Sequence, residues 1–379
     1  MKQVIMNDSP CIAFTGGGTG GHIYPGLAVA VQLKSINTMV RIIWIGSGNN
    51  MDRSIVEEAG IEFFGINSGK LRRYFSIKNF FDVFKIAAGF FNARAVLKKQ
   101  KPQLLFSKGG FVSVPPVIAA ASLAIPVWTH ESDFSPGLAT RINAKFAKKI
   151  FTAYEKTAQY FNEANRKKII LAGNPVRPVF YNADAAKGRE FIASISKDFI
   201  APNANKNILL VLGGSQGAKE INDLITKALP CLTKSFFVVH QTGAQDAGAP
   251  SSCENYLAIP FIKQEMPHVL AAASLVAGRS GAGTVWECAA VSRPMVLVPL
   301  SGSGTRGDQV ENARYFEEKG AAITLIHPDK EKLLSVILPL AQDKAALCAM
   351  SESAAAIGRL NGAHIVSEAV INFLKELKL

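Results

Sequence analysis

The sequence contains few cysteines, and they lie far apart. The five are Cys11, Cys231, Cys253, Cys288 and Cys348, and they form no Cys-x-x-Cys pair and no cluster with histidine. This pattern argues against a disulfide framework and against a structural zinc site, and it is typical of a protein from a reducing compartment.

Long uninterrupted apolar runs are also missing. The longest weakly polar stretch, residues 113–129, carries Pro115, Pro116 and Pro126. Because proline ends or kinks a helix, we expect a helix and a strand inside a domain here rather than a membrane span. The first eight residues lack the apolar core of a signal peptide, so we expect no secretory leader.

Acidic residues are scarce in the first half of the chain. Residues 1–178 contain 23 Lys and Arg against 10 Asp and Glu, whereas the remaining residues contain 19 of each, so the whole net charge of +13 lies in the first half. A one-sided basic surface indicates a polyanionic partner, such as nucleic acid, anionic lipid or a phosphorylated substrate. No nucleic-acid-binding motif accompanies the charge, so we expect no nucleic acid partner.

The length of 379 residues favours two domains over one compact core. Short apolar strands alternate with helical stretches in both halves, which predicts an α/β fold of two doubly wound parallel sheets with the ligand site in the cleft between them. We expect domains at residues 1–177 and 178–361, with a final helix at about 362–379 that packs on either half. The expected strands include residues 11–14, 41–46, 61–66, 104–107, 126–129, 169–171, 207–212, 236–241, 274–278 and 294–298.

A glycine-rich stretch at residues 15–25 connects the first strand to a helix. Five of the six positions from 16 to 21 are glycine, and we expect Pro25 in the first turn of the helix. Glycines let a backbone approach a ligand closely, and the start of a helix presents unpaired N–H groups and a positive dipole end. A ligand-free turn needs fewer glycines, so the stretch predicts an anion site, most often for phosphate.

Several nucleotide-binding signatures are incomplete. Gly16, Gly18 and Gly21 satisfy Gly-x-Gly-x-x-Gly, but the second strand ends at residues 45–48 without the carboxylate that holds a ribose in nicotinamide enzymes. No Walker-type Gly-Lys-Ser/Thr follows any glycine loop, and a strict Asp-x-Asp is absent; residues 131–133 come nearest to it. We therefore expect no cofactor and no metal, and a diphosphate site made of helix N-termini and backbone N–H groups.

Residues 76–101 carry apolar side chains at helical spacing, among them Ile77, Phe84, Ala88 and Phe91. For the later part we expect an ordinary helix that turns this face to the core and a basic face to solvent. For residues 70–81 two interpretations stay open, a core-facing segment or a patch that binds an anionic membrane surface. The patch would consist of Leu71, Arg72, Arg73, Tyr74, Phe75, Phe80 and Phe81.

The motifs together resemble the MurG family of peptidoglycan N-acetylglucosaminyltransferases, over about residues 11–325. The resemblance implies a GT-B fold and a hexosyltransferase that moves N-acetylglucosamine, with inversion, from UDP-N-acetylglucosamine to undecaprenyl-diphosphate-linked muramoyl-pentapeptide. It also implies a peripheral protein on the cytoplasmic face of a bacterial cell membrane, with roles in cell-wall biogenesis, cell shape and cell division. The motifs are residues 17–22, 109–113, 130–131, 173–177, 213–218, 279–282 with Glu287, and 308–309.

The resemblance also implies roles for individual residues. Gly17, Gly18, Gly109 and Gly110 would hold the acceptor diphosphate. Ile262 would pair with uracil through its backbone, Glu287 would accept from ribose hydroxyls, and Gln309 would hold the sugar. Asp133 stands where the family's motif has an amide, which puts its sugar contact in doubt. The whole implied donor set is Thr19, Gly20, Gly21, Asp133, Arg177, Ser215, Ile262, Ala282, Gly283, Thr284, Val285, Trp286, Glu287 and Gln309.

An inverting transfer needs a base that removes the proton of the attacking hydroxyl. His22 is our candidate because its ordinary pKa suits the task and it follows the first glycine loop. The alternative is that His22 only orients the loop or hydrogen-bonds a phosphate, in which case Asp133 or His130 is the base. Two other functions stay open as well, a UDP-sugar epimerase and a non-catalytic membrane-surface protein that binds nucleotide sugars.

Overall fold

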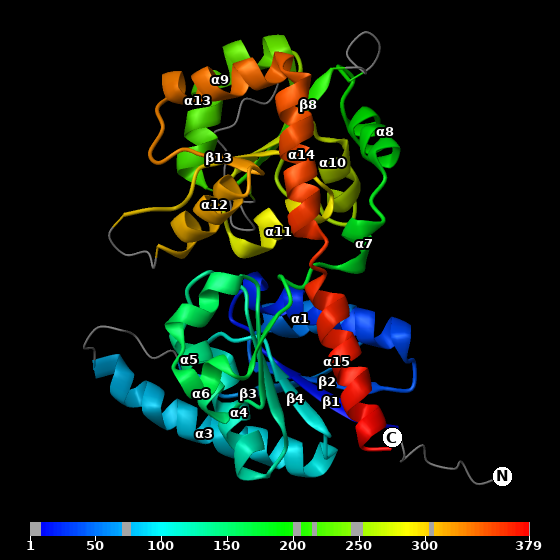
Figure 1. The fold of residues 1–379 in the computed structure, drawn as a ribbon, viewed down its shortest axis with the longest axis vertical. Coiled ribbons are helices and arrows are strands. Elements are labelled where there is room, and N and C mark those ends of the chain that lie inside the picture. The colour runs from blue at the N-terminus through cyan, green and yellow to red at the C-terminus, as the bar shows by residue number, and fades with distance from the viewer. Residues whose placement is uncertain are drawn as a thin grey trace, which may run out of the picture. The chain divides into compact units, whose positions relative to one another are not determined.

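A computed structural model describes residues 9–69, 77–199, 206–213, 218–243, 253–302 and 307–378, with side chains from residue 84 onward in the helix that begins at 77. The chain divides into two compact units (Figure 1). The first comprises Met1–Pro178 with Leu360–Leu379, and the second comprises Val179–Arg359.

The first unit is built on a seven-stranded parallel sheet in the order β3-β2-β1-β4-β5-β6-β7. Its strands are β1 (Cys11–Thr15), β2 (Arg41–Ser47), β3 (Glu62–Ile66), β4 (Leu104–Ser107), β5 (Val127–Glu131), β6 (Lys149–Thr152) and β7 (Ile169–Leu171). Its helices are α1 (Gly20–Ile36), α2 (Asn50–Glu58), α3 (Ile77–Gln100), α4 (Val114–Ser122), α5 (Leu138–Phe146), α6 (Glu163–Arg166) and α15 (Gly362–Glu376), with short 3₁₀ turns at Phe111–Ser113 and Glu155–Tyr160.

Both faces of this sheet are covered, as its nearly continuous apolar strands require. In β1, Ile12 and Phe14 join a cluster with α1, α2 and α15, whereas Cys11 and Ala13 join a cluster with α3, α4 and α5. The C-terminal helix α15 lies beside α1 (Figure 1). There Ser367 Oγ donates to Val29 O at 3.1 Å, and the Phe373 ring meets Trp128 at 5.5 Å. The tertiary structure thus places the last helix on the first unit, a choice that the sequence left open.

The second unit has a six-stranded parallel sheet in the order β10-β9-β8-β11-β12-β13. Its strands are β8 (Asn207–Leu212), β9 (Phe236–Gln241), β10 (Tyr256–Ile259), β11 (Leu275–Gly278), β12 (Met295–Leu297) and β13 (Ala322–Thr324). Its helices are α8 (Ala185–Ile195), α9 (Lys219–Ser235), α10 (Met266–Ala272), α11 (Ala282–Ala290), α12 (Asp308–Glu318), α13 (Lys330–Gln342) and α14 (Lys344–Gly358), and α7 (Pro178–Tyr181) leads into it.

Each sheet reverses its strand order once, between β1 and β4 in the first unit and between β8 and β11 in the second. Ligands of open parallel sheets bind at such switch points, outside the carboxyl ends of the strands. The predicted α/β fold with two doubly wound sheets is therefore confirmed, and the loops after β1, β4, β8 and β11 are the places to look for a site.

Three features differ from the sequence-based expectations. Pro25 is the sixth residue of α1 rather than part of its first turn, because the helix already begins at Gly20. Proline there removes the donor for the Gly21 carbonyl, and the adaptable backbone of two preceding glycines accommodates its ring. Strands β6, β10 and β13 were not predicted, since none of them leads directly into a glycine loop, as the similarly short β4 and β11 do.

The later part of α3 also differs from its prediction. Phe84 and Phe91 are 61% and 67% exposed, whereas Ala93 and Leu97 form the buried face. The aromatic spacing therefore marked the outer face of this helix, because the buried face is the row of Gly89, Ala93 and Leu97, one turn apart from one another.

No single helix in the described part of the chain is long and apolar enough to cross a membrane. Lys330–Gln342 and Lys344–Glu376 have the necessary length and composition only when they are counted together across a bend.

Candidate active site

The two glycine loops of the first unit touch each other at its switch point. A side chain at Gly110 would place its Cβ 2.8 Å from Cδ2 of His22 and 3.0 Å from Gly17 O. Gly18, Gly109 and Gly110 have φ of 82°, 83° and 78°, a conformation that favours glycine. The loops after β1 and β4 therefore meet only because both lack side chains.

The start of α1 presents its N–H groups without a side-chain cap. Thr19 occupies the N-cap position and makes no capping hydrogen bond, and Thr19 and Gly21 are exposed. Beneath the loop, the Trp44 indole N–H donates to Gly16 O at 3.0 Å. Uncapped N–H groups at a helix start, held on a rigid support, suit an anionic ligand.

A buried carboxylate that sequence reasoning missed lies under this loop. Asp52 has no exposed surface, and its Oδ2 accepts from the Gly18 N–H at 2.9 Å and from Ser47 Oγ at 2.6 Å. The Gly18 N–H is thus already hydrogen-bonded within the protein, so it is not available for the predicted contact with the acceptor diphosphate. The sequence signal was weak, because an acid in the first turn of α2 is usually a solvent-exposed helix-start residue.

His22 lies where the two loops meet. It is half-buried, its backbone N–H donates to Thr19 O at 3.1 Å, and its ring lies against Gly110. Nδ1 of the ring is buried, which leaves Nε2 as the nitrogen that could act as a general base.

His130 is placed differently, inside the sheet. Its ring is fully buried, and Nε2 donates to Gly173 O at 2.9 Å. Burial, reinforced by the nearby Lys108 charge, holds the pKa of His130 well below its ordinary value. A ring with no exposed surface does not reach an acceptor hydroxyl in this structure, so the case for His130 as the base is weakened.

Lys108 is a second buried charge that the sequence analysis did not single out. It is 2% exposed, directly after β4, and burial lowers the pKa of its ammonium to about 8 against the opposing attraction of Glu131 and Asp133. Glu131 itself organises the next loop, since its two carboxylate oxygens accept from the N–H groups of Asp133 and Gly137, both at 3.0 Å. Asp133 is half-exposed at the same edge.

Arg177 also belongs to this edge of the first unit. Its guanidinium carbon lies 5.6 Å from the centre of the Tyr24 ring, a cation–π distance. The Tyr24 ring in turn borders Gly20, where an added Cβ would lie 3.1 Å away. The structure therefore brings Arg177 to the start of α1, where His22 lies, although His22 and Arg177 are 155 positions apart in the chain.

In the second unit, α11 starts after β11 at the switch point. Its N-cap Gly281 makes no side-chain cap, and within the described ranges no atom outside the adjoining chain lies within 4 Å of a Cβ added at Gly281 or Gly283. Gly283, Thr284 and Glu287 are half-exposed. Open space beside an uncapped helix start suits a ligand in the same way as in the first unit.

Two members of the predicted donor set point the other way. Val285 and Trp286 are fully buried, and Trp286 packs edge-on against Phe316 at 5.9 Å. Ala282 is 8% exposed. Because α11 shows only one face to solvent, the side chains of Val285 and Trp286 belong to the core. These two residues can therefore contact a ligand only through their backbone.

The neighbouring loops hold the remaining donor candidates. The Ile262 N–H donates to Gln241 Oε1 at 2.9 Å, which leaves its carbonyl as the group for a base contact. Gln309 Oε1 accepts from the Leu300 N–H at 2.9 Å, and Ser280 Oγ donates to Gln309 O at 2.7 Å. Ser215 lies outside the described residues, as do Leu71, Arg72, Arg73, Tyr74 and Phe75, and the side chains of Phe80 and Phe81 are likewise not described.

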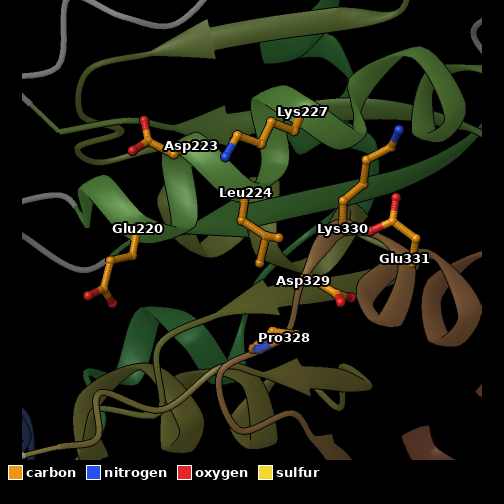
Figure 2. Close-up of a pocket in the computed structure, with 8 residues that line it drawn as sticks. All are labelled: Glu220, Asp223, Leu224, Lys227, Pro328, Asp329, Lys330 and Glu331. Atoms are coloured by element: carbon orange, nitrogen blue, oxygen red, sulfur yellow. The ribbon is translucent and has the colours of Figure 1, made fainter.

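A separate pocket in the second unit contains none of the predicted site residues. It lies between α9 and residues 328–331 (Figure 2), with Leu224 and Pro328 as its apolar members. Four carboxylates face two ammonium groups there, which disfavours an anionic ligand; the charged residues are Glu220, Asp223, Lys227, Asp329, Lys330 and Glu331. Within the described ranges, no three His, Cys, Asp or Glu residues are grouped as for a metal ion.

Comparisons with known proteins agree with this arrangement. Residues 12–152 match the model of the glycosyltransferase family 28 N-terminal domain, and residues 208–365 match that of its C-terminal domain. The chain is 25% identical to a crystal structure of Acinetobacter baumannii MurG, with a TM-score of 0.72 over 96% of this chain and 99% of that one. The fold is therefore that of a GT-B glycosyltransferase, as predicted, and the chain is an enzyme of this class.

Sequence relatives define the family more closely. The UDP-N-acetylglucosamine--N-acetylmuramyl-(pentapeptide) pyrophosphoryl-undecaprenol N-acetylglucosamine transferase of Treponema denticola is 51% identical over 84% of each chain. The protein of the same name from Treponema pallidum is 44% identical over 99% of this chain and 98% of its own. This chain belongs to that family, the MurG family, which confirms the resemblance. A UDP-GlcNAc 2-epimerase from Neisseria meningitidis, at 14% identity and a TM-score of 0.65, shares the fold alone.

Proposed function

We propose that this chain transfers N-acetylglucosamine from UDP-N-acetylglucosamine to the C4 hydroxyl of the muramoyl sugar of undecaprenyl-diphospho-muramoylpentapeptide, with inversion. The observation that carries the proposal is a relative of that name, 44% identical over nearly the whole chain. Uncapped helix starts at the switch points of both units support it chemically. The reaction is a step of peptidoglycan synthesis, on which cell shape and cell division depend.

The two units divide the substrates in this proposal. The first, residues 1–177 with the C-terminal helix, receives the acceptor and faces the membrane, and the second, residues 178–361, binds the nucleotide sugar. The loops that contain the glycines at 17–18 and 109–110 receive the acceptor diphosphate, and Thr19, Gly20 and Gly21 at the start of α1 contact the donor. The loop geometry supports an acceptor diphosphate at this place because that group carries charge and needs many donors.

Chemistry in the proposal is a single displacement. His22 takes the proton of the acceptor hydroxyl as its oxygen attacks the anomeric carbon of the donor, and UDP leaves from the opposite side. Arg177 pairs with the donor diphosphate, where a planar guanidinium matches phosphate oxygens. The negative charge of the leaving group is met by Arg177 and helix dipoles, so the proposal includes no metal ion.

The donor nucleoside is held by the second unit. Glu287 accepts hydrogen bonds from the ribose hydroxyls, the Ile262 carbonyl contacts the base, and the amide of Gln309 holds the sugar. Ser215 and its glycine loop hold the diphosphate. The half-exposed position of Glu287 and the open space at Gly283 support this assignment.

The test is UDP release from UDP-N-acetylglucosamine with and without a lipid-linked muramoyl-pentapeptide acceptor, in the presence of excess chelator. We expect acceptor-dependent release in the wild type, a lower kcat with an unchanged donor KM in His22→Ala, and a raised donor KM in Glu287→Ala. Alanine substitutions of the exposed residues His364 and Glu331 serve as controls. Donor turnover without the acceptor would instead indicate a UDP-sugar epimerase, and binding without turnover would indicate a non-catalytic protein.

We also propose that the protein is peripheral on the cytoplasmic face of the bacterial membrane. The basic first half supports an anionic surface as partner, and the exposed Phe84 and Phe91 extend the aromatic run of residues 71–81 along α3. The double variant Arg72→Glu/Arg73→Glu should bind anionic vesicles less tightly than Lys98→Glu/Lys99→Glu, which makes the same charge change in the last turn of α3. Equal binding by the two variants would contradict the patch.

A further inference from the structure

The buried carboxylate of Asp52 joins three segments of the first unit. Its Oδ2 accepts from Gly18 in the loop after β1 and from Ser47 at the end of β2. Its backbone N–H donates to Asn49 Oδ1 at 2.7 Å, the N-cap of α2. A side chain at Gly17 would place its Cβ 2.2 Å from Oδ2, so the loop backbone lies directly on the carboxylate.

A negative charge at this position needs a reason. Burying a carboxylate is costly unless strong hydrogen bonds compensate, and this one lies under a loop whose ligand is itself an anion. A neutral acceptor would satisfy the same donors without repelling that anion. A carboxylate makes shorter and stronger hydrogen bonds, since bonds to a charged acceptor are roughly twice as strong as those to a neutral one.

The bond to Gly18 acts on groups further along the loop. Gly18 has φ of 82° and directly precedes Thr19, the N-cap of α1. Fixing the Gly18 peptide therefore fixes the direction of the next N–H groups and, through them, the ring of His22 against Gly110. A glycine loop without such a hold samples many conformations, which would cost the precision that catalysis needs.

We propose that Asp52 is a positioning residue for the transfer reaction: by holding the Gly18 N–H, it sets the start of α1 and His22 for the acceptor. This inference rests on the proposed function. It assigns Asp52 no contact with either substrate, and it takes the Gly18 N–H out of the set that receives the acceptor diphosphate.

The experiment measures kcat and KM for the lipid acceptor and for UDP-N-acetylglucosamine, together with Tm, in Asp52→Ala, Asp52→Asn and Ser47→Ala. We expect Asp52→Ala to lose roughly 10- to 100-fold in kcat/KM for the acceptor, as a misplaced catalytic group does, with an unchanged KM for the donor. Asp52→Asn keeps a neutral oxygen for Gly18, whose hydrogen bond is weaker, and should recover only part of the loss. Ser47→Ala removes the hydrogen bond from Ser47 Oγ to Asp52 Oδ2, and its loss in kcat/KM should lie between those of the two Asp52 variants.

The control is Asn162→Ala, which removes an N-cap hydrogen bond to the Asn165 N–H in the same unit. It should lower Tm without changing either KM. If Asp52→Ala and Ser47→Ala lose rate only in proportion to Tm, as the control does, Asp52 is structural and the inference is overturned. Loss in Asp52→Asn equal to that in Asp52→Ala would also overturn it. Absence of acceptor-dependent transfer in the wild type would overturn the proposed function instead, and the inference with it.

Discussion

Gly110 provides a sharp test of the site, because its position couples backbone conformation to His22. The substitution Gly110→Ala has two consequences. Alanine at φ 78° and ψ 156° costs about 1–3 kcal/mol, because this backbone region is essentially confined to glycine. The new Cβ would also lie 2.8 Å from Cδ2 of His22, so the ring must move.

Gly109→Ala separates the two consequences. Its φ of 83° also disfavours a residue with a Cβ, but that Cβ would meet Thr140 Oγ1 at 3.2 Å and is not placed against His22. Both variants should therefore lower Tm by a few degrees, about 2–4 °C per kcal/mol for a unit of this size. Only Gly110→Ala should add a large loss of kcat, roughly 100-fold for a base displaced by about 1 Å.

The assay is acceptor-dependent UDP release, with kcat corrected for the active fraction, and Tm measured in parallel. A kcat for Gly110→Ala equal to that of Gly109→Ala would refute the reasoning, because the contact with His22 would then have no catalytic effect. Wild-type kcat in Gly110→Ala would refute it more directly.

Three further predictions concern stability. Burial lowers the pKa of Lys108 from 10.5 to about 8. The folded protein therefore carries the full cost of burying the charge below pH 8, and its free energy of unfolding increases as pH rises from 8 to 10.5. Lys108→Met should raise Tm at pH 7 by the equivalent of about 2–3 kcal/mol, and calorimetry should show this advantage shrinking between pH 8 and 10.5. Gly188→Ala should destabilise the second unit by about 1–3 kcal/mol in urea titration, because its Cβ would overlap His268 O, whereas Gly281→Ala, with open space, should not. Deleting residues 362–379 should expose Trp128 and the buried side of α1 and make the first unit sensitive to limited proteolysis, and a resistant truncated chain would contradict the role of α15.

The sequence alone predicted the class of fold well, for a physical reason. The long apolar strands β1, β2, β8 and β9 are buried on both faces, and such runs followed by glycine and a helix are typical of parallel sheets. Strands β6 and β13 escaped, because neither leads directly into a glycine loop that marks its end, whereas the similarly short β4 and β11 do. The outward aromatic face of α3 escaped because helical spacing does not say which side faces the sheet.

Contacts between distant segments depend on the tertiary structure and could not be predicted from the sequence. The sequence placed glycine loops at strand ends, and it carried the motifs of the family. It could not show that Asp52 turns inward onto Gly18, that His130 has no exposed surface, or that Arg177 lies over Tyr24. Each of these follows from which strands become neighbours and how helices pack on them, and that order is set by the burial of the whole chain rather than by any local run of residues.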